Sequence, residues 1–187
     1  MGLALELVSE RRVLRPAEMR DLDFYFELRN RPEILALPGR QASPRSDVER
    51  QLQRWLERWQ DRGFGAWTVF ERKTEVRLGR VELDPIGEGW SHLGPDEIEM
   101  GCIVDPTYWN QGIATEAAQL AAADFFNRTE LDRLIALTTA DNRPSLCALE
   151  KLGVRRCGQT EHERDQTTYE LFELVASALP PAHSTGR

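Results

Sequence analysis

The sequence of 187 residues lacks any apolar run of the roughly 20 residues that a membrane-spanning helix requires. Residues 1–16 also lack the basic region that precedes the apolar core of a secretion signal, and they carry an acidic residue at Glu6. We therefore expect neither a membrane segment nor a secretion signal, and a cytoplasmic location is the default expectation.

Cysteine and histidine are both scarce. The three cysteines, Cys102, Cys147 and Cys157, are an odd number without a close pair, which argues against a disulfide framework and against a zinc site. We expect three buried thiols. The histidines lie far apart, in expected loops and in the C-terminal tail: His92, His162 and His183. Because they do not have the spacing of metal ligands, we expect no metal.

The charge balance is acidic, with 31 Asp and Glu against 24 Lys and Arg and a formal net charge of −7. This balance disfavours nonspecific binding to nucleic acid and is compatible with a cationic substrate such as an amine. Charged residues make up 29% of the chain and hydrophobic residues 41%, which is typical of a globular domain with a core of its own. With no internal repeat or linker, we expect one domain over residues 1–178 and a disordered tail over residues 179–187.

The most informative stretch is residues 97–127, which predicts a strand, a short loop and a long helix. The apolar residues of the strand alternate: Ile98, Met100, Cys102 and Val104. Pro106 stops the strand near Val104, because proline has no amide to donate to a sheet. The apolar residues of the helix fall on one face: Ile113, Ala117, Leu120, Ala121 and Phe125. We expect that face to pack on a sheet.

The start of this helix has the features of an anion site. The first turn of a helix carries amide hydrogens without partners and a partial positive charge, and the small residues Gly112 and Ala114 let a ligand approach them. No Lys-Ser or Lys-Thr pair follows the glycine and no GxGxxG is present, which argues against a nucleoside triphosphate. A pyrophosphate held by amides fits better. The alternative is an ordinary crossover helix in which Gly112 is only a turn residue.

The remaining pattern predicts strands and helices in mixed order. We expect further strands over residues 11–15, 66–71, 76–83, 134–139, 155–161 and 167–174, and further helices within 17–37, over 46–62 and over 142–153. In the glycine-rich loop 84–95, Trp90 and His92 either contact a substrate or only cover apolar surface or are mobile.

Two segments resemble the N-acetyltransferases of the GNAT family. The runs EMGCIV at 99–104 and YWNQGIATEA at 108–117 are similar to the acetyl-coenzyme A segment of its RimJ/RimL-like branch, and NRPSLCALEKLGV at 142–154 is similar to a later family helix. The broad family has Arg or Gln at the position of Trp109, and the Tyr-Trp pair found here resembles the RimJ/RimL-like branch. The family also usually has an aromatic residue at the position of Val154. The resemblance covers residues 11–174. It implies the GNAT acyl-CoA N-acyltransferase fold, an α/β (α+β) domain whose mixed, mostly antiparallel sheet has splayed central strands and flanking helices.

The resemblance also implies the ligand, acetyl-CoA, as cosubstrate. The strand would pair with the pantetheine arm, the loop amides would bind the pyrophosphate, and Asn142 would orient the pantetheine. The implied contact residues are Cys102, Ile103, Val104, Asn110, Gln111, Gly112, Ile113, Ala114, Thr115, Asn142 and Ser145.

Two of the implied residues would be catalytic. A base is useful because a lysine-like amine with a pKa of about 10.4 is almost wholly protonated at pH 7, and Glu99 occupies the position of the implied base. Ser145 would donate to the departing thiolate, with Tyr169 as a weaker candidate. The alternative is that Glu99 is a solvated carboxylate and Ser145 only a helix-start hydroxyl.

A covalent acetyl-enzyme is not expected. Cys102 and Cys147 have no histidine close in sequence and lie among apolar residues, where a thiol is usually inert. Direct transfer in a ternary complex is the preferred mechanism.

The acceptor stays open between the primary amine of a protein N-terminus and that of a small molecule, because loops 37–47 and 84–95 carry no readable pattern. Two rival readings also stay open: a coenzyme A-binding sensor or interaction module without turnover, and a site for another phosphate-bearing ligand. We expect no nucleic-acid partner and no membrane partner, and a homodimer is left open.

Overall fold

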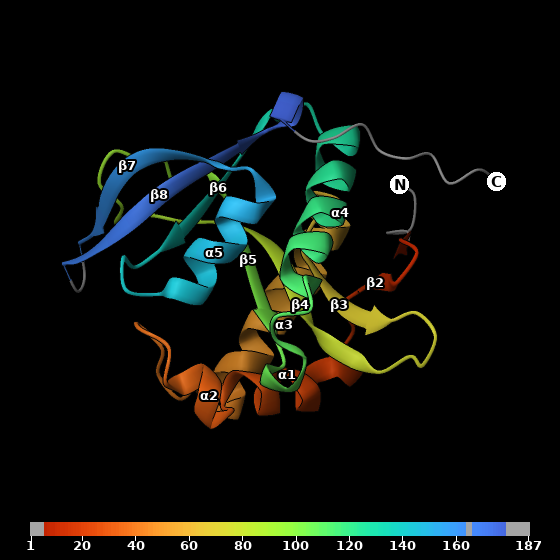
Figure 1. Cartoon of the computed structure of the whole chain (residues 1–187). Coiled ribbons are helices and arrows are strands. Elements are labelled where there is room, and N and C mark those ends of the chain that lie inside the picture. The colour runs from red at the N-terminus through yellow and green to blue at the C-terminus, as the bar shows by residue number, and fades with distance from the viewer. Residues whose placement is uncertain (1–5, 164–165, 179–187) are drawn as a thin grey trace.

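The chain folds around one mixed sheet with helices on both faces (Figure 1). The computed structural model describes residues 6–163 and 166–178, so the tail expected at residues 179–187 lies outside the described residues. The strands are β1 (Leu7–Val8), β2 (Arg12–Pro16), β3 (Ala66–Glu71), β4 (Arg77–Pro85), β5 (Ile98–Val104), β6 (Arg133–Thr138), β7 (Arg155–His162) and β8 (Thr167–Val175). The helices are α1 (Leu22–Arg29), α2 (Pro32–Leu35), α3 (Arg45–Asp61), α4 (Ile113–Arg128) and α5 (Arg143–Leu152), with 3₁₀ turns η1 (Met19–Asp21), η2 (Pro106–Tyr108) and η3 (Ala176–Ala178).

The strands of the sheet follow the order β1-β2-β3-β4-β5-β6-β8-β7. All neighbours are antiparallel except β5 and β6, which are parallel and share a single residue pair, Glu99 with Ile135. This arrangement confirms the expected mostly antiparallel sheet with splayed central strands. The short strand β1, which the sequence pattern did not predict, adds an edge beside β2.

Alternation along β4 divides its side chains between the two faces of the sheet. Val81 and Leu83 belong to one buried cluster together with Ala121 and Phe125 of α4. On the other face, Tyr25, Leu52 and Trp55 of α1 and α3 form a second buried cluster. The charged residues of β4 therefore point toward α1 and α3 and not toward α4.

The local elements largely match the expected ones. The expected pair of strands 66–71 and 76–83 is the antiparallel pair β3 and β4, and Pro32 opens α2 after interrupting the helical segment 17–37. Within the part of the chain that the structure describes, no helix has the length and apolar composition needed to cross a membrane.

Candidate active site

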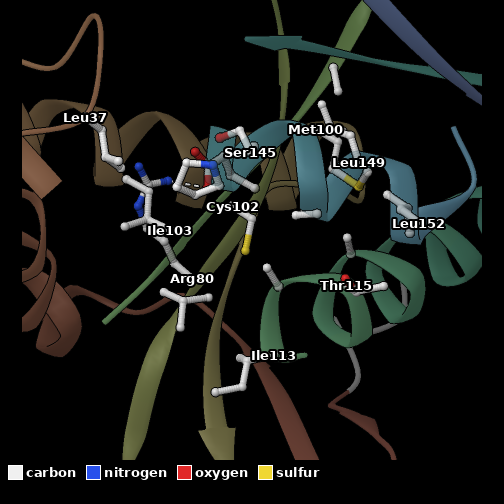
Figure 2. A pocket seen from close by; sticks show the side chains of 18 of the residues that line it. Leu37, Arg80, Met100, Cys102, Ile103, Ile113, Thr115, Ser145, Leu149 and Leu152 are labelled. Carbon is white, nitrogen blue, oxygen red and sulfur yellow. Dashed lines mark ion pairs between the residues drawn. The ribbon is translucent and has the colours of Figure 1, made fainter. Parts of the chain in front are cut away.

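A cavity of about 550 Å³ opens where β5 and β6 diverge. Because these strands pair only at Glu99, the edge of β5 that faces β6 is uncovered beyond that residue. Figure 2 shows Cys102 at the centre, with Leu37 and Arg80 on one side and Thr115 on the other. All the implied contact residues line the cavity except Gln111 and Asn142.

The amides at the start of α4 form an anion-binding cradle at one end of the cavity. The first amide of this helix with a backbone acceptor is that of Glu116, which donates to the carbonyl of Gly112 at 3.0 Å. For the amides of residues 112–115, no acceptor is present among the described residues. Gly112 has φ of +75°, a conformation that favours glycine, and a Cβ there would have only the guanidinium of Arg11 nearby, at 3.9 Å. Arg11 forms an ion pair with Glu116 at 2.6 Å, so it is the unpaired amides that suit a diphosphate.

The loop that carries the cradle is attached to the end of β5. The indole Nε1 of Trp109 donates a hydrogen bond of 2.8 Å to the carbonyl of Val104. The carbonyl oxygen of Val104, a residue expected to pair with pantetheine, therefore already accepts one hydrogen bond from within the chain. Trp109, the residue that departs from the broad family pattern, holds the loop against the strand.

Glu99 lies where β5 and β6 separate, and its side chain lines the cavity. Burial raises the pKa of Glu99 from its ordinary 4.5 to about 7, the nearby Glu82 carboxylate adds to the rise, and the guanidinium of Arg40 opposes it. A carboxyl group with this pKa is ionised in about half of the molecules near neutral pH, as suits a general base.

The raised pKa has a consequence for stability. Between pH 4.5 and pH 7 the folded chain keeps a proton on Glu99 that the unfolded chain has lost, so this group makes folding less favourable as the pH rises through that window. Glu99→Gln should therefore stabilise the chain at pH 8 by on the order of 2–3 kcal/mol, and by much less at pH 4.5. Urea unfolding at the two pH values measures the difference. Glu57→Gln, at an exposed position of α3, controls for the loss of one carboxylate, and an equal effect of the two substitutions would contradict the expectation.

Ser145 and Asn142 meet at the start of α5 in different roles. Ser145 lines the cavity, whereas Asn142 is buried at 5% exposure and its Oδ1 accepts a hydrogen bond from the amide of Ser145 at 3.4 Å. Asn142 is the N-cap of α5. The structure thus places it as a support for the helix that presents Ser145, and off the cavity wall.

The cysteines are less buried than expected. Cys147 and Cys157 are exposed, so the expectation of three buried thiols is wrong for both of them. Cys102 is half-buried and lines the cavity, where burial, assisted by the Glu82 carboxylate, raises its pKa to about 12. A thiol held in its protonated form is a poor nucleophile, which argues against a covalent role for Cys102. Cys147 also lines the cavity.

The sequence analysis missed a group of polar and charged residues on the side of the cavity that α1, α2 and α3 cover. They line the cavity together with the expected residues: Arg29, Arg40, Gln51, Arg80, Glu82 and Asp84. Arg80 is only 4% exposed, stacks over the Trp55 ring at 4.7 Å and forms an ion pair with Glu82. Gly101 makes room for this pair, because a Cβ there would lie 2.6 Å from Oε1 of Glu82. The alternation of charged and apolar residues along 80–84 was the available signal.

Trp90 and His92, the other substrate candidates, do not line the cavity. The Trp90 ring packs against His162 at 4.7 Å and against Tyr169 at 5.2 Å between centroids. Trp90 therefore covers the β7–β8 hairpin, which is the alternative that the sequence left open for it.

Comparison with known proteins agrees with this geometry. A family model described as Acetyltransferase (GNAT) domain matches residues 11–155. An uncharacterized N-acetyltransferase of Bacillus subtilis, YnaD, is 36% identical over 69 residues, which is 37% of this chain and 41% of that protein. An uncharacterized protein of the same organism, YkkB, is 28% identical over 160 residues, which is 82% of this chain and 87% of that protein.

Solved structures share the fold at low sequence identity. An acetyltransferase from Agrobacterium tumefaciens has a TM-score of 0.76 and 20% identity, covering 91% of this chain and 94% of the other. RimL, a ribosomal-protein acetyltransferase solved in complex with coenzyme A, has a TM-score of 0.72 and 16% identity, covering 93% and 99%. These similarities show the fold that surrounds the cavity.

Proposed function

Because the chain belongs to the GNAT acetyltransferase family, we propose that it transfers the acetyl group of acetyl-CoA to a primary amine, directly within a ternary complex. One observation carries the proposal: a single cavity connects the unpaired amides at the start of α4 to the carboxyl group of Glu99. Neither feature alone would distinguish acetyl transfer from simple binding of a phosphate. Their separation by an open strand edge leaves room for a pantetheine arm between them.

The residues present fit acetyl-CoA. The amides of Gly112, Ile113, Ala114 and Thr115 would hold the pyrophosphate, and the uncovered edge of β5 would bind the amide groups of pantetheine. When bound, acetyl-CoA supplies the acetyl group as a reactive thioester. Its reactive end would then lie beside Glu99 and Ser145, which both line the cavity.

In the proposed reaction, Glu99 accepts one proton from the ammonium group of the acceptor and passes it to solvent. The neutral nitrogen then forms a bond to the acetyl carbon as the carbon–sulfur bond breaks. Ser145 donates a hydrogen bond to the sulfur as negative charge develops there, and the second amine proton ends on that sulfur. The products are an amide and the free thiol of coenzyme A.

We further propose that the chain is closest in type to the RimJ/RimL-like branch, whose acceptors are protein N-termini or small amines. The support is the Tyr108-Trp109 variant, in which Trp109 holds the cradle loop against β5. The similarity to RimL in complex with coenzyme A supports the shared fold and does not select an acceptor.

The test combines binding and turnover with the full chain. We expect calorimetry to show acetyl-CoA binding, and we expect thiol release to depend on an added primary amine drawn from a panel of amino acids, polyamines and peptides. Mass spectrometry should then find one acetyl group on the amine and none on the protein. Binding without acetylation of any amine would contradict the proposal and favour a coenzyme A sensor.

A further inference from the structure

Three arginines from separate elements line the α1–α2 side of the cavity. Arg29 lies in the last turn of α1, Arg40 in the loop after α2 and Arg80 within β4. Figure 2 shows Arg80 on the opposite side of Cys102 from Thr115 at the start of α4. Arg29 and Arg40 both lie close enough to Arg80 to repel it, so we place the three arginines together, away from the amides that would hold the pyrophosphate.

The described residues supply too few carboxylates to balance these guanidinium groups. Arg80 forms an ion pair with Glu82. Arg29 donates a hydrogen bond of 2.8 Å to the neutral Oε1 of Gln51. Among residues 6–163 and 166–178, no carboxylate forms an ion pair with Arg29 or with Arg40.

The other carboxylates of the cavity do not remove this excess. Asp84 forms an ion pair with Arg58 and accepts a hydrogen bond of 3.0 Å from Nε1 of Trp55. Glu99 is only partly ionised near neutral pH, because its pKa is about 7. Burial and repulsion by Arg80 lower the pKa of both Arg29 and Arg40, and the nearby carboxylates, Glu82 for both and Glu99 for Arg40, offset this lowering only in part.

We propose that the acceptor is a small amine that also carries a carboxylate, and that Arg29 and Arg40 bind this carboxylate. This inference rests on the proposed acetyl transfer. A guanidinium group binds a carboxylate through two parallel hydrogen bonds. Two guanidinium groups in one cavity therefore favour a ligand that carries a carboxylate. Glu82 and Glu99 line the same cavity and would receive the ammonium end. A polycation would instead meet the uncompensated charge of Arg29 and Arg40.

The size of the cavity favours a small molecule over a peptide. Its volume of about 550 Å³ must hold the end of the pantetheine arm as well as the acceptor, and ligand sites of this size serve small molecules. Acetylation forms the nitrogen–carbon bond, breaks the carbon–sulfur bond and moves one proton to solvent and one to the sulfur. The product keeps its carboxylate and loses its positive charge.

Matched pairs of acceptors test the inference directly. Each amino acid of a series with increasing distance between amine and carboxylate is compared with its own carboxamide, and kcat/KM is followed by release of the coenzyme A thiol. For the best amino acid, we expect kcat/KM to exceed that of its carboxamide by about ten- to a hundredfold, which is the contribution of a hydrogen-bonded charge pair. Arg40→Gln should move this ratio toward one. Arg40 lies in the loop after α2 and belongs to none of the buried apolar clusters, so the substitution should leave the fold intact, which circular dichroism checks.

Arg54→Gln is the matched control, because Arg54 is an exposed arginine of α3 that does not line the cavity, and it should keep the wild-type ratio. Equal turnover of acids and amides, or a preference for polyamines, would overturn the inference while the proposed acetyl transfer stands. A tripeptide with an acidic second residue that outcompetes every free amino acid would overturn the choice of a small molecule. Failure to acetylate any amine would overturn both proposals.

Discussion

Replacing Glu99 by glutamine is expected to lower kcat/KM for amine acetylation by about a hundred- to ten-thousandfold, the range that a general base contributes. Glutamine has nearly the shape of glutamate, but its amide accepts no proton from the ammonium group. Glu97→Gln is the matched control, because Glu97 lies two residues earlier in the chain and outside the cavity. Its rate should remain close to that of the wild type.

The pH dependence separates a base from a residue that only shapes the cavity. Because burial and the Glu82 carboxylate raise the pKa of Glu99 to about 7, kcat/KM should fall as the pH drops below 7. The ionised fraction of this carboxyl decreases about tenfold for each pH unit below its pKa. In the Glu99→Gln variant, the pH dependence of kcat/KM should reflect only the titration of the acceptor amine. A Glu99→Gln variant with the wild-type rate and profile would refute the role of this residue.

Gly112→Val is expected to weaken coenzyme A binding by about a hundredfold or more, because several hydrogen bonds to charged phosphate oxygens depend on this backbone. Gly112 has φ of +75°, and valine in that region is strained by its branched side chain. Apart from the two adjoining residues, no described atom lies nearer than 3.9 Å to a Cβ at this position. The loss should therefore come from the conformation of the loop and from the crowded cradle, and calorimetric titration with coenzyme A measures it.

Gly153→Val is the matched control for backbone strain. Gly153 ends α5 with φ of +78° and lies outside the cavity, and a Cβ at this position would have no described atom within 4 Å. Both variants should lose similar stability in thermal unfolding, and only Gly112→Val should lose affinity. If both variants bound coenzyme A with equal affinity, the amides at the start of α4 would not be part of the binding site.

The central part of the site could be predicted because it is local in sequence. Pro106 ends β5, Gly112 precedes α4, and the apolar face of α4 follows the helical period, so about 30 neighbouring residues specify a strand, a loop and a helix. The divergence of β5 and β6 is a property of the whole sheet. It entered the sequence analysis only through the family resemblance.

The arginine-rich side of the cavity could not be predicted in the same way. Along β4, Arg80, Glu82 and Asp84 alternate with apolar residues, a pattern typical of a strand with one face in solvent. In the structure α1 and α3 cover that face, and Tyr25 and Trp55 flank Arg80. Contacts between segments more than 20 residues apart decide whether such residues face water or a ligand.

The cysteines show a related limit of the pattern. Cys147 lies on an exposed face of α5, and Cys157 lies on the edge strand β7, which is largely exposed over residues 155–159. Composition predicts burial for the average thiol, whereas the face of the helix or the place of the strand that carries it decides each case.

Because β5 and β6 share a single residue pair, the sheet consists of two halves, β1 to β5 and β6 to β8. Among the described residues, the halves are joined only where Glu99 pairs with Ile135. A pantetheine arm lying in the gap would act as a surrogate strand and bridge the halves through hydrogen bonds that the polypeptide leaves unmade. The cosubstrate would then complete the architecture of its own enzyme, which favours an ordered sequence in which it enters before the amine.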